Sequence, residues 1–252
     1  MKSHIHEPGK KMIKCITFDL DDTLWAVQPV VRAANQTMYA WLHENSPLFN
    51  QMYNLSDLNL LREDVVLAQP DISYSVTRIR LAVLELGLSR AGYEAAHAKA
   101  LAEQAFNIFL AARQEVVFFE HALAVVEGLK ASGYIVGAIS NGNADIKQVG
   151  LSHCMDFQFS ADQIGVEKPD PLIFEHMLQH TKLQPEEVIH IGDHPIHDIQ
   201  GAKDAGLWSI WVNLEKQQSW QPADFNADAT VHCLSEIPAA VEKLSAQRRV
   251  RL

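Results

Sequence analysis

Residues 15–24 read Cys-Ile-Thr-Phe-Asp-Leu-Asp-Asp-Thr-Leu, and this stretch determines the expected fold. The segment 12–18 is apolar and rich in β-favouring residues, which predicts a strand buried on both faces. Three carboxylates follow it, and in extended chain Asp19 and Asp21 would point the same way because alternate residues share a face. Carboxylates crowded at a buried strand end repel one another unless a cation balances them, and such oxygen ligands favour Mg²⁺. The alternative is an acidic strand end that merely faces water.

Three later signals weaken that alternative, and each of them borders an apolar run. They are Ile-Ser-Asn-Gly at 139–142, Lys-Pro-Asp-Pro at 168–171, and Gly-Asp, four further residues and Asp at 192–198. Together, in this order, the four stretches resemble the motifs of the haloacid dehalogenase superfamily of phosphohydrolases. The resemblance covers nearly the whole chain, and the combination is far more specific than any single motif.

The composition is that of a folded, acidic protein. The chain has 252 residues, 48% of them hydrophobic, and a formal net charge of −10, which suits one large domain or two small ones. Nucleic-acid and anionic-membrane binders are usually basic, so neither partner is expected. Three widely separated cysteines, no secretory signal and no apolar run of spanning length favour a cytoplasmic protein. With the resemblance, we expect a monomer or a weak dimer that binds a small phosphorylated metabolite.

Residues 26–113 have a helical texture, with few glycines, sparse β-branched runs and apolar positions at helical spacing. Ser56 and Asp57 are candidate N-cap residues, and Gly87 is a candidate helix end. We therefore expect a helical bundle inserted just after the first motif. The expected helices are 30–42, 58–68, 76–86 and 93–112.

Strands and helices alternate after residue 113, which predicts a parallel sheet with helices on both faces. Such sheets bind ligands at the C-terminal ends of their strands, and all four motifs fall at or after expected strand ends, so we expect one site. The fold class is α/β: a Rossmann-like parallel sheet at 1–25 and 114–252, with an all-α cap domain at 26–113. The other expected strands are 134–139, 157–160, 188–191, 207–212 and 230–232, and the other expected helices are 122–131, 171–180, 199–205 and 237–244.

The resemblance implies roles for the acidic residues. It makes Asp19 the nucleophile that takes the phosphoryl group, with one oxygen also on Mg²⁺. Asp21 would be general acid to the leaving group and then general base for water, and its backbone carbonyl would be a metal ligand. Asp193 would be the second carboxylate ligand, and Asp198 would orient water or Lys168 from the outer shell. The acid at position 21 argues for phosphoryl chemistry, because true haloacid dehalogenases lack it and need no metal.

The other motif residues would hold the phosphoryl group. In the family pattern Lys168 neutralises the nucleophile and the transferring group, which is electrostatic stabilisation. The Ser140 hydroxyl and the groups around Asn141 end an expected strand, where they can bind phosphate oxygens. Thr23 belongs with them, at a position that supports the first loop by hydrogen bonding. Taken alone, these residues would be a surface lysine and a turn signal.

Three histidines, His190, His194 and His197, raise the alternative of a zinc site, since imidazole with carboxylate suits that metal. An oxygen-rich site beside phosphate-type motifs suits Mg²⁺ better. The histidines are therefore expected to have outer-shell or surface roles.

The helical insert lies between the first and second motifs, the position of a C1-type cap, which closes over the site and excludes water. Gln-Pro-Val at 28–30, Val-Thr-Arg-Ile-Arg at 76–80 and Ser-Asn-Gly-Asn-Ala at 140–144 resemble the YigB-type bacterial phosphatases. Those act on FMN and on 5-amino-6-(5-phosphoribitylamino)uracil, an intermediate of riboflavin biosynthesis. The resemblance makes Arg78 and Arg80 candidate substrate contacts from the cap.

Other interpretations stay open at this point. The substrate could be a sugar phosphate or a nucleotide, or the enzyme a phosphomutase or phosphonatase on the same scaffold. A phosphonatase would want a Schiff-base lysine in the cap, and Lys99, deep in an Ala-rich helix, supports that alternative poorly. A catalytically idle binding protein would be expected to have lost an acid or the lysine, and all of them are present.

Overall fold

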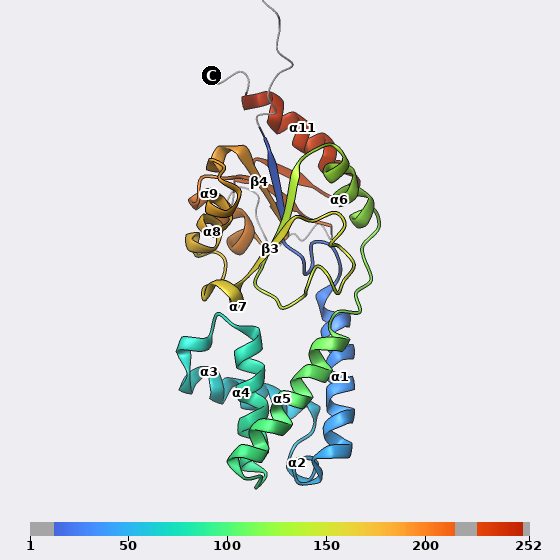
Figure 1. Ribbon diagram of the computed structural model, residues 1–252, viewed down its shortest axis with the longest axis vertical. Coiled ribbons are helices and arrows are strands. Elements are labelled where there is room, and N and C mark those ends of the chain that lie inside the picture. The colour runs from blue at the N-terminus through green and yellow to red at the C-terminus, as the bar shows by residue number, and fades with distance from the viewer. Residues whose placement is uncertain (1–12, 215–225, 249–252) are drawn as a thin grey trace, which may run out of the picture.

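The computed structural model describes residues 13–214 and 226–248, so residue 12, the expected start of the first strand, lies outside the described residues. A sheet with helices on its faces forms one end of the molecule, and a helical bundle forms the other (Figure 1). The bundle is inserted between the first two strands of the sheet. This is the arrangement that the four motifs and the helical texture predicted.

The described residues form a six-stranded parallel sheet in the order β3-β2-β1-β4-β5-β6. The chain builds outward from β1 to β3 and then returns to the other side of β1 as β4. The strand order therefore reverses between β1 and β4, and the C-terminal ends of these two strands flank a point where open α/β sheets bind ligands. The strands are β1 Cys15–Phe18, β2 Ile135–Ser140, β3 Phe157–Ser160, β4 Val188–Gly192, β5 Trp208–Val212 and β6 Ala229–Val231.

Helices cover both faces of the sheet, which explains why all residues of β1 and β4 are buried and why these strands read as apolar runs. One buried cluster joins the sheet to α6 and α11, and a second joins it to α8 and α9 (Figure 1). The helices of this part are α6 Ala122–Ala131, α7 Ala161–Ile164, α8 Pro171–Thr181, the π-helix η4 Pro195–Gln200, α9 Gly201–Asp204 and α11 Ile237–Arg248, with 3-10 turns η3 Pro185–Glu187 and η5 Leu234–Glu236. The single helix expected at 199–205 is thus the end of a π-helix followed by α9.

The helical part has buried clusters of its own. Helices α1 and α5 pack against each other, α4 packs on α5, and α3 packs on α4. The helical part thus has a core that is largely its own, while Val30 of α1 packs into the core of the sheet, and the division of the chain at 25/26 and 113/114 stays a proposal. The helices are α1 Val27–Asn45, α2 Pro47–Met52, α3 Leu58–Ala68, α4 Val76–Arg90 and α5 Ala95–Ala112, with 3-10 turns η1 Leu55–Asp57 and η2 Pro70–Ile72.

The structure corrects two local predictions in the helical part. Gly87 does not end a helix but lies buried inside α4, where any side chain would collide with the rings and methyls of Phe49 and Leu61. Capping before α3 comes from Asn54, whose side chain accepts from the backbone N–H of Ser56. Asp57 occupies the N-cap position of α3, as predicted, but its side chain makes no capping hydrogen bond to that helix and accepts from the backbone N–H of Asn54.

None of the helices in the described ranges is both long enough and apolar enough to cross a membrane. The predicted α/β class with a parallel sheet is confirmed.

Candidate active site

A buried lysine connects three strand ends at the switch point of the sheet. The side chain of Lys168 is 2% exposed, and its ammonium donates to Asp19 Oδ1 at 2.6 Å, to Asp198 Oδ1 at 2.6 Å and to the Ile139 carbonyl at 2.7 Å. An ammonium has three donors, and all three are satisfied here. Asp19 directly follows β1, Ile139 belongs to β2, and Asp198 lies in η4, just after β4. Residues that are far apart in the sequence therefore meet because the parallel strands end at one edge.

The charges of this group depend on one another. Burial alone would lower the pKa of Lys168, but Asp19 and Asp198 outweigh burial and hold that pKa above its ordinary value. Burial would raise the pKa of Asp198, yet Lys168 and His190 hold it well below its ordinary range. Lys168 is thus a cation and Asp198 an anion, which is the state that electrostatic stabilisation of a phosphoryl group needs.

His190 continues the network into the sheet. It is fully buried in β4, with Nε2 3.1 Å from Asp198 Oδ1 and Nδ1 2.9 Å from the Thr17 hydroxyl. Burial lowers the pKa of His190, which favours the neutral ring. Because a carboxylate can only accept, Nε2 is the protonated nitrogen and Nδ1 accepts from Thr17. This geometry supports the outer-shell role expected of His190 and leaves it unable to serve as a zinc ligand without rearrangement.

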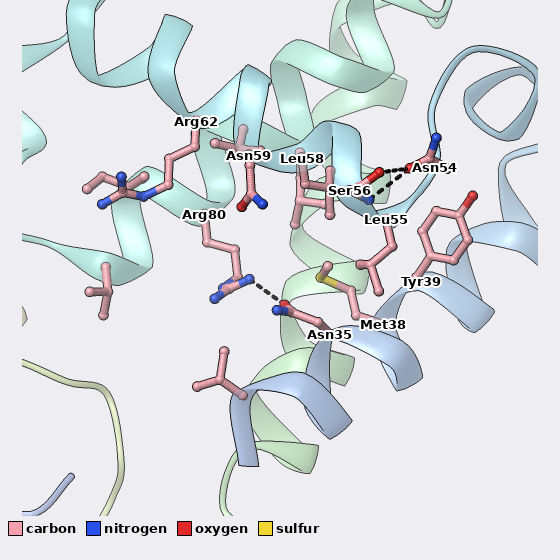
Figure 2. A pocket seen from close by; sticks show the side chains of 15 residues that line it. Asn35, Met38, Tyr39, Asn54, Leu55, Ser56, Leu58, Asn59, Arg62 and Arg80 are labelled. Carbon is pink, nitrogen blue, oxygen red and sulfur yellow. Dashed lines mark hydrogen bonds between the residues drawn. The ribbon is translucent and has the colours of Figure 1, made fainter. Parts of the chain in front are cut away.

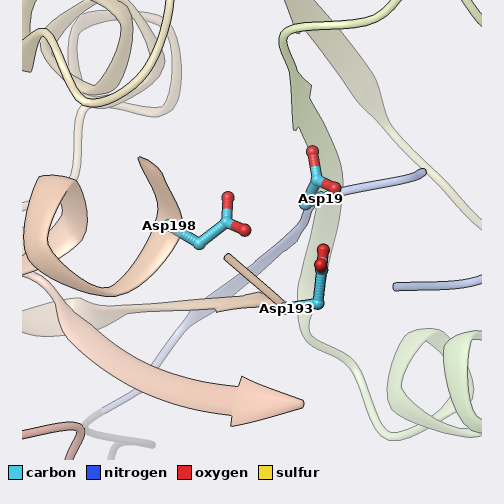
Figure 3. A group of neighbouring side chains, drawn as sticks. All are labelled: Asp19, Asp193 and Asp198. Atoms are coloured by element: carbon cyan, nitrogen blue, oxygen red, sulfur yellow. The ribbon is translucent and has the colours of Figure 1, made fainter. Parts of the chain in front are cut away.

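Three carboxylates lie together at this site (Figure 3), and two of them accept from Lys168. Oxygens of Asp19, Asp193 and Asp198 all lie within 4.8 Å of one another. Burial raises the pKa of Asp19 well above its ordinary value, and burial with the charge of Asp198 raises that of Asp193 to about 7. A divalent cation among these oxygens would offset both costs, and an all-oxygen donor set suits a hard metal. The cluster could therefore hold a metal ion.

Two of the three acids are the better candidates for metal ligands. Asp198 already accepts from Lys168 and His190 through Oδ1, and from the His194 backbone N–H through Oδ2 at 2.9 Å. Asp193 accepts from the Thr23 hydroxyl at 3.0 Å through Oδ1. With the described residues, Asp198 thus makes three side-chain hydrogen bonds, whereas the Asp19 and Asp193 carboxylates accept one each, which leaves those two acids more capacity for a metal ion.

Asp21 has a partner that sequence reasoning missed. Arg113, 1% exposed, donates through Nη2 to both carboxylate oxygens of Asp21, at 2.7 and 2.5 Å. Trp25 Nε1 donates to the same carboxylate at 2.8 Å, and Arg113 Nε donates to Asn143 Oδ1 at 3.1 Å. Arg113 follows α5 directly and belongs to no motif, so only the fold reveals that it lies beside the first loop.

Glycines in two of the motifs make room for these contacts. A side chain at Gly142 would strike the Asp21 carboxylate, and one at Gly192 would strike Asp198. The Gly in Ser-Asn-Gly and the Gly in Gly-Asp are therefore required by the close approach of two acids to the backbone.

The second-motif residues and Thr23 mainly organise the loops. The Ser140 hydroxyl, 1% exposed as a residue, accepts from the Gly142 backbone N–H at 3.0 Å. Asn141 forms two hydrogen bonds with the backbone of Lys168, donating to its carbonyl at 3.0 Å and accepting from its N–H at 2.8 Å. The Asn141 side chain thus fixes the backbone of the lysine. Thr23 is fully buried, and the partner of its hydroxyl is Asp193, so it supports a proposed metal ligand.

The two cap arginines lie in different surroundings. Arg78 is exposed, with its guanidinium 5.6 Å from the Tyr74 ring. Arg80, two residues on, points inward, donates to Asn35 Oδ1 at 2.7 Å and lies 3.6 Å over the Phe109 ring.

Comparisons with known proteins bear on this arrangement. A family model for haloacid dehalogenase-like hydrolases matches residues 13–206. The chain belongs to this family. The predicted family is thereby confirmed, and it has phosphatases and dehalogenases among its named members.

Two curated relatives of this hydrolase family are named as phosphatases. The 5-amino-6-(5-phospho-D-ribitylamino)uracil phosphatase YigB of Escherichia coli K12 is 29% identical over 211 residues, 82% of this chain and 88% of that protein. A glyceraldehyde 3-phosphate phosphatase of Pyrococcus furiosus is 28% identical over 222 residues, 82% of this chain and 83% of that protein.

A solved structure of a 2-haloacid dehalogenase from Pseudomonas syringae pv. tomato DC3000 is 35% identical, with a TM-score of 0.85, and covers 92% of this chain and 99% of that one.

Proposed function

We propose that the protein is a Mg²⁺-dependent phosphomonoesterase that forms an aspartyl-phosphate on Asp19. The observation that carries the proposal is the meeting of Asp19, Asp193 and Lys168 at the switch point of the sheet. The phosphatase-named relatives support the activity. A nucleophilic carboxylate beside a fixed cation divides a difficult hydrolysis into two easier steps.

In the first step an oxygen of Asp19 attacks phosphorus, and the bond from phosphorus to the leaving oxygen breaks. Protonated Asp21 gives its proton to that oxygen, so the alcohol leaves neutral. In the second step Asp21 takes a proton from water, the water oxygen attacks the aspartyl-phosphate, and phosphate leaves as the Asp19 carboxylate is restored. Arg113 and Trp25 hold the Asp21 carboxyl in place for both proton transfers.

The charges around phosphorus come from fixed groups. Lys168 stays protonated and balances the three phosphoryl oxygens, while Asp198 holds its ammonium in place. Asp19, Asp193 and the Asp21 carbonyl would hold Mg²⁺, which when bound supplies further positive charge to the phosphoryl oxygens.

For the substrate, we propose FMN or 5-amino-6-(5-phosphoribitylamino)uracil, which would place the enzyme in flavin metabolism. The relative named for the second compound, aligned over most of both chains, supports this choice. A cytoplasmic location and a monomer or weak dimer complete the proposal. The three free cysteines are consistent with a reducing compartment.

The test measures phosphate release from p-nitrophenyl phosphate with Mg²⁺, and again after chelation. We expect turnover only with the metal, and loss of turnover in Asp19→Asn while thermal unfolding stays cooperative. Asp71→Asn, an exposed acid of the helical part, is the matched control and should keep full activity. Unchanged turnover in Asp19→Asn would exclude Asp19 as the nucleophile. For the substrate, FMN should rank among the best in a panel that includes sugar phosphates, nucleotides and glyceraldehyde 3-phosphate.

A second candidate activity is dehalogenation, favoured by the 35% identity to the solved dehalogenase. In dehalogenation a carboxylate attacks carbon and halide leaves, so the leaving group needs no proton from Asp21. The acid at position 21, bound by Arg113, and the cluster of three acids speak for phosphoryl transfer. Chloride release from 2-chloropropionate without added metal would instead favour dehalogenation over phosphoryl transfer.

A further inference from the structure

A cavity of about 850 Å³ lies inside the helical part, between α1, α3, α4 and η1 (Figure 2). Its walls are largely aliphatic, and Asn35, Asn59, Arg62 and Arg80 supply polar groups. Tyr39, Asn54 and Ser56 add further polar groups on the η1 side. The size lies within the range of pockets that enclose a whole small-molecule ligand, and such pockets combine apolar walls with polar groups that fix the orientation of the ligand.

The charge of the cavity is opposite to that of the protein. The chain carries 31 Asp and Glu residues against 21 Lys and Arg, yet none of the described residues that line the cavity is acidic and two are arginines. No carboxylate there neutralises the arginines. The cavity thus favours a ligand with electron-rich oxygens over a cation.

Arg80 is the most constrained of these groups. Its guanidinium lies over the Phe109 ring and donates one hydrogen bond, to Asn35, and its buried Nε has no hydrogen-bond partner in the described part of the chain. Burial, then the positive charges of Arg113 and Arg62, lowers the pKa of Arg80 to about 10. An unsatisfied buried donor is costly, and a ligand oxygen would satisfy it.

Contacts link the cavity to the catalytic loops. Phe109, beneath Arg80, lies one helical turn before Arg113, which holds Asp21. Next to Val76 on the cavity wall, the Thr77 hydroxyl accepts from Asn143 of the second-motif loop at 3.2 Å. Residues beside the cavity wall therefore reach the catalytic loops through the Phe109–Arg113 turn of helix and through the Thr77–Asn143 hydrogen bond.

We propose that this cavity receives the leaving group of the substrate, and that this group contains a large, planar ring with carbonyl oxygens read by Arg80 and Asn35. The inference rests on the proposed phosphatase function and narrows its substrate class. Three-carbon leaving groups such as those of glyceraldehyde 3-phosphate or phosphoserine would leave most of 850 Å³ unfilled. A flat heterocycle covers the aliphatic walls and brings acceptor oxygens to the guanidinium.

The first experiment needs no catalysis. Riboflavin, the alcohol released from FMN, is titrated into the full-length protein, and its fluorescence is followed. We expect binding to wild type, and a dissociation constant raised at least ~10-fold in Arg80→Gln, since one charge-assisted contact is worth that much. Asn59→Trp, at an exposed position that lines the cavity, should weaken binding similarly by filling space. Arg32→Gln, an exposed arginine of α1 that does not line the cavity, is the matched control and should bind as wild type.

The second experiment compares kcat/KM for FMN with that for p-nitrophenyl phosphate. The ratio should fall at least ~10-fold in Arg80→Gln and in Asn59→Trp. Absence of riboflavin binding to wild type, or binding as tight as that of wild type in both cavity variants, would overturn the cavity assignment while p-nitrophenyl phosphate turnover could still establish the phosphatase. Riboflavin binding that responds to both variants, in a protein that hydrolyses no phosphate ester, would keep the ring site and overturn the phosphatase.

Discussion

Arg113 and Asp21 form a bidentate contact across 92 positions of sequence, in which one guanidinium nitrogen donates to both carboxylate oxygens. Arg113 directly follows the last helix of the cap, and Asp21 is the proposed general acid and base. The proposed proton donor is therefore oriented by a residue at the border of the cap.

Replacing Arg113 should damage turnover more than binding. In Arg113→Lys a point charge replaces a planar fork that also holds Asn143, so Asp21 loses its fixed orientation. We expect kcat for p-nitrophenyl phosphate to fall ~10-fold or more, because general acid–base catalysis depends on positioning, while KM changes little. Arg32→Lys, on an exposed face of α1, is the control. An unchanged kcat in Arg113→Lys would contradict this role.

Mg²⁺ should stabilise the folded protein. Asp19 and Asp193 are buried near each other, and a cation bound between them would stabilise only the folded state, by about 2.7 kcal/mol at a hundredfold excess over Kd. Thermal unfolding should therefore shift upward with added Mg²⁺. In Asp193→Asn the shift should disappear, while the metal-free variant should unfold no earlier than metal-free wild type because a buried repulsion is removed. A full Mg²⁺ shift in Asp193→Asn would remove this residue from the metal site.

One acid outside the site should contribute to stability in a pH-dependent way. Asp156 accepts from Lys130 at 2.5 Å and from the Val136 backbone N–H at 3.0 Å, and these contacts outweigh burial and hold its pKa below the ordinary 3.8. The stabilisation is present above pH 4 and is lost as the pH falls through the lower, folded-state pKa. Both ion-pair partners are more than a third exposed, so we expect Asp156→Asn to cost only ~0.5–1 kcal/mol at pH 7. In urea unfolding, the difference in unfolding free energy between wild type and Asp156→Asn should be smaller at pH 3 than at pH 7. The same difference at both pH values would contradict the pH-dependent contribution of Asp156.

Two glycines should respond oppositely to alanine. A side chain at Gly137 in β2 would overlap the Phe157 ring of the neighbouring strand, whereas one at Gly128 in α6 meets nothing within 4 Å. We expect Gly137→Ala to destabilise by ~1–3 kcal/mol through overpacking. Gly128→Ala should stabilise by ~0.5–1 kcal/mol, because alanine restricts the unfolded chain and favours helix. Equal changes in unfolding free energy for the two variants, measured in urea, would contradict this prediction. They would show that the Phe157 ring moves away from a side chain at position 137 without loss of stability.

The sequence predicted those features that local patterns encode. Apolar runs ending in polar motifs located the parallel strands, and the rule that such strands end at one edge brought Asp19, Lys168 and Asp193 together. Arg113 was missed because its importance arises only when the end of α5 meets the first loop. Gly87 was misread because a glycine near a helix end usually signals termination, while here the packing of Phe49 decides the residue. The cavity, too, depends on how three helices and a turn meet, which no single segment of sequence records.

Hydrogen bonds around the proposed nucleophile connect five residues in one series. Thr17 contacts His190, His190 contacts Asp198, Asp198 contacts Lys168, and Lys168 returns to Asp19, two residues from the start. No residue of the helical insert takes part in this series of hydrogen bonds. Exchange of the insert during evolution would therefore leave these charges around Asp19 as they are. It would change the residues that select the substrate and would also replace Arg113, the partner of Asp21.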